Sequence, residues 1–253
     1  MGLCCNREPK KEPKYPSNIE NKAEIEIDRF FEKYFPIQNK TKKGKKIKKG
    51  KKMSEKKFNI FLEYMEVKKN QEYFLGKLTD YRTVGYNISL DAFNYLEKIF
   101  SFIVDSLTRN NISNDISNEN LGIFRNLIIL SQTFYKITEN EKIYLHEKLK
   151  DKEIFHVIEF WKKYSEYIIK QEIEKLIKNE ETNQEGEKLD KLREKGAFSQ
   201  LLDIIKNMKD FEFEKNQIKE TIAEYIKQYN ISEEYQLALN SIINQPIISK
   251  KNK

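Results

Sequence analysis

The chain of 253 residues is short of cysteine, proline and glycine, and each shortage excludes a class of structure. Its only cysteines, Cys4 and Cys5, are adjacent near one end, so the body has no material for a disulfide scaffold. None of the five prolines lies between residues 37 and 245, and the whole chain has only eight glycines. A sheet-rich domain of this size needs more turn residues, so the composition favours helices.

Long hydrophobic runs are also missing. No stretch approaches the roughly 18 apolar residues that a membrane-spanning helix requires. Residues 1–30 lack the continuous apolar run of a secretory signal. Any attachment to a membrane is therefore expected from lipid or from surface charge. Aromatic residues make up 12% of the chain, which predicts a core built from large side chains.

Apolar residues recur at helical spacing through most of the chain. This pattern predicts an all-α protein, an irregular multi-helix bundle with a disordered, basic N-terminal arm. The helical domain is placed at residues 58–245 and is followed by a tail at 246–253. Ser89 and Ser232 precede two of the apolar stripes and are predicted to be helix caps.

Two predictions concern the middle of this domain. Thr138 and Glu141 have the spacing of a capping box, which predicts a helix over 139–149. A long helix is predicted from about residue 151 to 178, with an inward-facing stripe that includes Ile154, Val157, Trp161 and Tyr164. The polar residues 179–195 that follow are predicted to be a mobile connection.

Positive charge is concentrated ahead of this domain. Residues 1–57 hold 18 Lys and Arg against 8 Asp and Glu, a balance of +10, and the remainder has a balance of −3. We divide this region into an extended tether at 1–17, a short amphipathic helix at 18–36 and a polybasic linker at 37–57. The residues expected to touch a membrane are Lys40, Lys42, Lys43, Lys45, Lys46, Lys48, Lys49, Lys51 and Lys52.

The first five residues, Met-Gly-Leu-Cys-Cys, predict a double lipid anchor. Gly2 is the acceptor for myristate once Met1 is removed, and Cys4 and Cys5 are candidates for palmitate. Position 6, where Ser or Thr is usual, holds Asn6. One myristoyl chain gives only marginal binding, about 10⁴ M⁻¹, so a second signal is needed. The alternative is a chance Met-Gly start with two free thiols.

The lysine-rich segment has three interpretations. It can bind anionic lipid, at up to about 1 kcal/mol per lysine near the surface. It can be a plain solvated linker. It can bind nucleic acid, but it lacks the arginines and interleaved aromatics that specific readers use, so a nucleic-acid partner is unlikely. Anionic membrane lipid is our preferred partner.

A series of motifs in the helical domain resembles a known family. The motifs are Thr133–Tyr135, Tyr144–Leu145, Phe160–Trp161, Phe198–Leu201 and Asn207–Phe211. Their order and spacing are similar to those of the helical domain of the set-binding-factor type, found in certain myotubularin-related pseudophosphatases and in small cytosolic animal proteins of unassigned activity. The resemblance covers roughly residues 58–245. It implies a helical fold and a role near membrane trafficking or phosphoinositide regulation, and no catalytic residue. This chain has Glu212 where the family often has glycine.

No arrangement typical of catalysis is recognisable. His146 and His156 lack cysteine partners for zinc, so both are expected to be ordinary helix residues. Ser131 and Ser199 lie on apolar stripes without a glycine elbow, so both are interpreted as packing positions. Trp161, with Phe160 and Tyr164, is interpreted as core, and the alternative is an anchor for a partner helix. We expect no enzyme activity, no metal, no cofactor and no small-molecule substrate.

These observations together predict a lipid-anchored peripheral membrane protein. It would lie on the cytoplasmic face of the plasma membrane or an endomembrane and present its helical domain to an unidentified protein partner, as an adaptor or scaffold. The alternative is a cytoskeleton- or microtubule-associated protein that uses the lysine-rich segment against an acidic filament.

Overall fold

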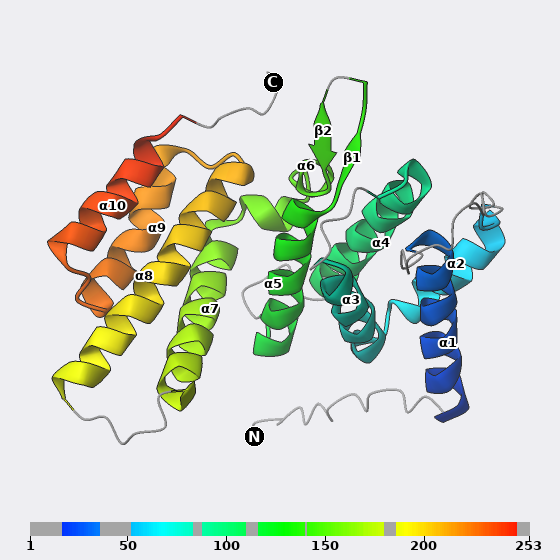
Figure 1. The fold of residues 1–253 in the computed structure, drawn as a ribbon, viewed down its shortest axis with the longest axis horizontal. Helices are drawn as coiled ribbons and strands as arrows, with labels where there is room; N and C mark the ends of the chain where they lie inside the picture. Colours follow the sequence, from blue (N-terminus) through cyan, green and yellow to red (C-terminus); the bar gives the residue numbers. More distant parts are fainter. Residues whose placement is uncertain are drawn as a thin grey trace, which may run out of the picture.

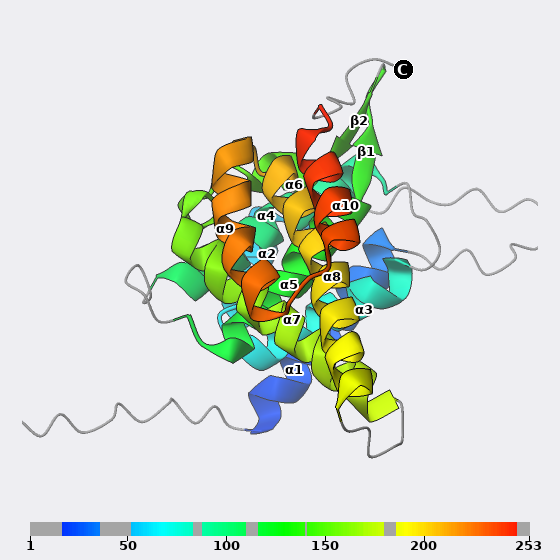
Figure 2. The same ribbon diagram turned by 90° about the vertical axis from the view of Figure 1, so that its left-hand side faces the viewer.

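The computed structural model of the chain describes residues 17–35, 52–82, 88–109, 116–139, 141–179 and 186–246. These residues form ten α-helices, one short 3₁₀ helix and a two-stranded hairpin, so the predicted all-α class is confirmed. The chain runs across the molecule from α1 and α2 at one end to α8, α9 and α10 at the other (Figure 1). The last three helices form one end of the molecule and lie nearest the viewer in Figure 2.

The first half of the molecule contains five helices: α1 (Ser17–Tyr34), α2 (Glu55–Tyr64), α3 (Lys68–Arg82), α4 (Leu90–Thr108) and α5 (Asn118–Thr133). A hairpin and two short helical turns follow: β1 (Tyr135–Ile137), β2 (Lys142–Tyr144), α6 (His146–Leu149) and the 3₁₀ helix η1 (Glu153–His156). The second half contains four long helices: α7 (Ile158–Asn179), α8 (Glu187–Asp210), α9 (Lys215–Gln228) and α10 (Glu233–Asn244).

Helix α1, predicted as a separate amphipathic helix over 18–36, is packed into the same core as the helices after it. The Phe30 side chain is buried, and its ring lies 5.0 Å from that of Phe61 and 5.8 Å from that of Phe74. Phe31 stacks on Tyr81 of α3 at 5.3 Å. Burying one such side chain contributes about 1.5–3 kcal/mol, so α1 is part of the folded body.

The prediction of a helix over 139–149 is wrong for most of this range. Strands β1 and β2 pair as a hairpin, with Tyr135 opposite Tyr144 in antiparallel register. The Thr138 amide donates to the Glu141 carbonyl at 2.9 Å, which closes the tip. The Thr-x-x-Glu pattern of a capping box is therefore the polar tip of a hairpin. The flanking aromatic and β-branched residues favour strands, and only His146–Leu149 is helical.

The long helix predicted from residue 151 begins later, at Ile158. Residues Glu153–His156 form η1, and Val157 is extended, with φ −88° and ψ 115°. Val157, expected to face inward, is 39% exposed. The Trp161 indole donates to the Phe155 carbonyl at 2.9 Å, which stabilises this break. Trp161 and its aromatic neighbours are buried, so their interpretation as core is confirmed.

The connection predicted at 179–195 is helical from residue 187 onward, and residues 180–185 lie outside the described residues. Helix α8 begins at Glu187, and its first turns carry charged pairs such as Lys191 with Glu187, at 2.6 Å. Polar helices without an apolar stripe are stabilised by such pairs three or four residues apart. Helix α8 ends in a Schellman motif, in which the Phe213 amide donates to the Met208 carbonyl at 2.9 Å. Glu212 takes the left-handed conformation there, with φ 65°.

Candidate functional site

Most residues of the predicted membrane site lie outside the described part of the chain. This applies to Gly2, Cys4 and Cys5 and to the lysines from Lys40 to Lys51. Lys52 is described, with a side chain that is 76% exposed and an amine 3.3 Å from the Asp91 carboxylate. The linker predicted at 37–57 is therefore too long at its C-terminal end, because residues 52–57 belong to the body and α2 starts at Glu55.

The two described ends of this region meet at one point, which we call the Met53 clamp and which consists of Tyr34, Met53 and Tyr95. The Met53 amide donates to the hydroxyls of Tyr34 and Tyr95, each at 3.0 Å. The Tyr95 hydroxyl donates back to the Met53 carbonyl at 3.3 Å. Burial and the hydrogen bond with Tyr34 raise the pKa of Tyr95, so the hydroxyl stays protonated at neutral pH.

The clamp revises the predicted place of the lysine-rich segment in the fold. Tyr34 is the last residue of α1, and Met53 precedes α2 by two residues. Residues 37–51, which we call the lysine segment, therefore connect two parts of the body that are in hydrogen-bond contact through Tyr34 and Met53. The segment is an insertion between two packed helices, and it does not separate an arm from a domain.

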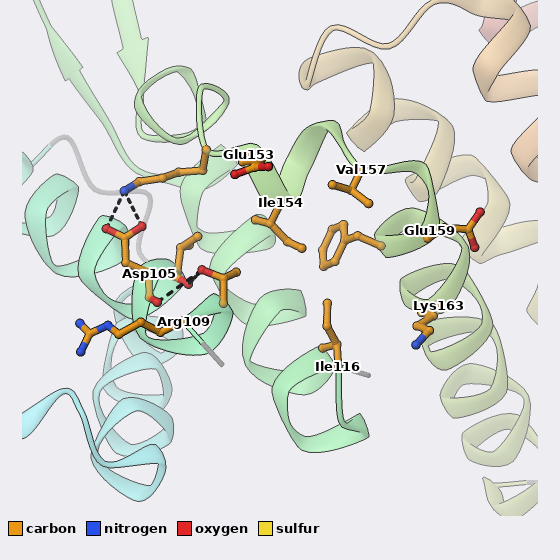
Figure 3. Close-up of a pocket in the computed structure, with 12 residues that line it drawn as sticks. Asp105, Arg109, Ile116, Glu153, Ile154, Val157, Glu159 and Lys163 are labelled. Carbon is orange, nitrogen blue, oxygen red and sulfur yellow. Dashed lines mark hydrogen bonds and ion pairs between the residues drawn. The ribbon is translucent and has the colours of Figure 1, made fainter. Parts of the chain in front are cut away.

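A second feature is a pocket of about 290 Å³ between the end of α4, the start of α5, η1 and the start of α7. Its apolar lining consists of Val104, Ile116, Ile154, Val157 and Phe160. Ile116, Ile154 and Val157 face a common space, and the charged ends of Arg109 and Glu159 point away from it (Figure 3). The break before α7 creates this pocket, because it turns Ile154 and Val157 out of the helix stripe.

The rim of the pocket carries equal numbers of opposite charges. The bases are Arg109, Lys152 and Lys163, and the acids are Asp105, Glu153 and Glu159. Lys152 binds both oxygens of Asp105 at 2.8 Å, across the mouth from α4. Arg109 binds Glu66 at 3.1 Å, and Glu159 is 2.8 Å from Lys162. The pocket therefore has an apolar floor and a charged rim, and most charges of the rim are paired with opposite charges.

The remaining candidates of the sequence are ordinary structural residues in the described chain. The Ser131 hydroxyl donates to the Ile128 carbonyl at 2.8 Å, and the Ser199 hydroxyl donates to the Gly196 carbonyl at 2.9 Å, as packing positions do. His156 is exposed at the end of η1. Within the described ranges, no group of three or more His, Cys, Asp or Glu side chains is arranged to hold a metal ion. Among the described helices, none combines the length and apolar character needed to cross a bilayer.

Comparison with known proteins adds no assignment: no family model matches the chain, and neither a curated protein nor a solved structure matches it. The site residues that sequence reasoning missed are those of the pocket. Ile154 and Val157 fit the helical period of Trp161, and no glycine or proline marks the break before α7. The sequence pattern therefore carries no signal for the pocket.

Proposed function

We propose that the protein is a lipid-anchored peripheral membrane adaptor. Gly2 carries myristate, Cys4 and Cys5 carry palmitate, and the lysine segment contacts anionic lipid. The helical body then presents a surface to a protein partner.

The Met53 clamp is the observation that carries this proposal. The lysine segment holds eight lysines, and no acidic residue lies between Lys33 and Ser54. Tyr34 and Met53, which flank the segment, are hydrogen-bonded to each other, so the segment is attached to the body at one place. We expect charge attached in this way to act together with an acyl chain on the same surface. Lysines near anionic lipid add up to about 1 kcal/mol each, which supplies the second signal that one myristoyl chain requires.

Contacts in the second half of the molecule support the resemblance to the set-binding-factor type of domain. The Trp161 ring lies 5.6 Å from that of Phe211, so two of the motifs are in contact. The Asn207 side chain accepts a hydrogen bond at 2.8 Å from Gln132, the neighbour of the Thr133–Tyr135 motif. Glu212 is in the conformation that glycine adopts most easily, at the position where the family often has glycine. By analogy, the resemblance suggests an interaction domain, which is the adaptor half of the proposal.

The proposal is tested by mass spectrometry of the intact native protein and by cell fractionation. We expect loss of Met1, an added C14 chain at Gly2 and a C16 chain that hydroxylamine removes. Gly2→Ala should move the protein from membranes to the cytosol, since each lost methylene removes about 0.8 kcal/mol of membrane affinity. Native protein with an unmodified N-terminus and free thiols would contradict the proposal.

A further inference from the structure

The pocket at the start of α7 is lined by apolar side chains that remain accessible to solvent. Val157 is 39% exposed, and Ile116 and Ile154 are only partly buried. Leaving such surface in water costs about 25 cal/mol for each Å², so an apolar ligand that covers it would be stabilised. A cavity of about 290 Å³ is close to the lower limit for small-molecule sites, ~300–1,000 Å³, so it suits a small apolar group such as part of an acyl chain.

The rim argues against a charged ligand. Its three bases and three acids sum to zero, and both Lys152 and Arg109 are already bound to carboxylates. An anionic ligand would have to replace these ion pairs. An acyl chain in amide linkage carries no charge, because its carboxyl group is consumed in the amide bond. The rim therefore favours an amide-linked chain over a free fatty acid.

The chain itself can supply such a ligand. The first sixteen residues precede α1 and can span up to about 50 Å when extended, at ~3.3–3.6 Å per residue. A folded chain of this length has a radius of gyration of about 18 Å. The reach of an acyl group on Gly2 is therefore comparable with the dimensions of the body.

We propose that the myristoyl chain on Gly2 docks in the pocket lined by Ile116, Ile154, Val157 and Phe160 when the protein is off the membrane. This inference rests on the proposed acylation of Gly2. The same chain then has two alternative sites, the pocket and the bilayer. The apparent affinity for vesicles is the affinity of the undocked protein multiplied by the undocked fraction. The pocket shields the chain from water, and anionic lipid at the lysine segment shifts the balance toward the membrane.

The first test uses the full chain, with and without myristate, and two matched variants. Val157→Glu places a charge on the pocket floor at a position that is already solvent-accessible. Leu237→Glu makes the same change on α10, where Leu237 is 71% exposed. Myristoylation should raise the Tm of the wild type and of Leu237→Glu by ~3 °C or more, and should leave the Tm of Val157→Glu unchanged. An equal shift in all three proteins, or no shift in any, would overturn the docking.

Vesicle binding gives the second measurement. Myristoylated Val157→Glu should bind phosphatidylcholine vesicles about tenfold more tightly than the wild type if nine-tenths of the wild-type chains are docked. Leu237→Glu should bind as the wild type does. Equal binding by Val157→Glu and the wild type would count against the pocket while leaving the membrane anchor intact.

A third measurement separates this inference from the proposed function. A myristoylated peptide of residues 2–16 is titrated into the full Gly2→Ala chain, and the fluorescence of Trp161 is followed. Trp161 is the only tryptophan, and its ring lies 5.4 Å from that of Phe160 in the pocket wall. We expect saturable binding that Val157→Glu abolishes and that the unacylated peptide lacks. Failure of the peptide to bind would overturn the docking proposal whether or not Gly2 is acylated in cells. An unmodified native Gly2 would overturn only the proposed membrane anchor.

Discussion

Two helical glycines differ in the space around them, one crowded by a neighbouring helix and one open, so substituting each tests packing at a single residue. A Cβ atom at Gly196 of α8 would meet Ile173 Cγ1 of α7 at 2.9 Å and the Ile173 backbone at 3.4 Å. A Cβ atom at Gly76 of α3 would meet nothing within 4 Å. Glycine thus allows α7 and α8 to approach closely, and it has no such role in α3.

We expect Gly196→Ala and Gly76→Ala to change stability in opposite directions. Alanine at Gly76 should raise the free energy of unfolding by about 0.5–1 kcal/mol, because it restricts the unfolded chain and favours the helix. Alanine at Gly196 gains the same propensity but overpacks the interface at a cost of about 1–3 kcal/mol, so a net loss of about 1 kcal/mol is expected. Urea unfolding measures both values. A gain in stability for Gly196→Ala would contradict the close approach of α7 and α8.

At the scale of elements, a polar cluster joins α1 to α3. The Asp28 carboxylate of α1 accepts a hydrogen bond from the Tyr73 hydroxyl at 2.9 Å and lies 2.9 Å from the Lys77 amine. Burial acts to raise the pKa of Asp28, but the hydrogen bonds from Lys77 and Tyr73 outweigh it, and the pKa is lowered. The docking of α1 is therefore coupled to the ionisation of Asp28.

This coupling predicts a pH-dependent effect of Asp28→Asn. A lowered pKa in the folded state stabilises the protein above the ordinary aspartate pKa of about 3.9, and that stability is lost as the pH falls through the lowered pKa. Because the pair is partly exposed and screened by solvent, Asp28→Asn should cost only about 0.5 kcal/mol at pH 7. The difference from the wild type should shrink below about pH 4. The matched control is Glu72→Gln, at an exposed position on α3. A difference between Asp28→Asn and the wild type that stays constant with pH would contradict the coupling.

For the molecule as a whole, apolar periodicity predicts the class of fold and most helices, because each helix buries one stripe. It does not predict which elements pack together. The aromatic stripe of Phe30 and Phe31 is visible in the sequence, but its partners on α2 and α3 come after the lysine segment. The Met53 clamp depends on a backbone amide, which has no side-chain signature. The hairpin and the pocket break the helical period without glycine or proline. The aromatic and β-branched residues of the hairpin are a weak local signal for its strands, and the pocket has none.

The clamp predicts that the lysine segment can be removed without unfolding the body. Replacing residues 37–51 by six Gly and Ser residues should preserve the fold, because the two ends already meet at Met53. Since a shorter loop loses less entropy on closure, by about 0.6 kcal/mol per halving of its length, the free energy of unfolding should rise slightly. A deletion from residue 40 to 57 would instead remove Met53 and the first turn of α2, and it would confuse loss of binding with loss of structure.

The same replacement separates the two functions considered for this chain. If the segment binds lipid, the replaced protein should lose affinity for vesicles that contain phosphatidylserine, and affinity for neutral vesicles should be unchanged. A variant with glutamine at all eight lysines of the segment keeps the length and should show the same loss, because charge is the cause. If phosphatidylserine binding instead survives in both variants and binding to acidic filaments disappears, the segment serves a cytoskeletal partner. In that case the acyl chains alone must hold the protein at a membrane, because the lysines of the segment would be engaged by the filament.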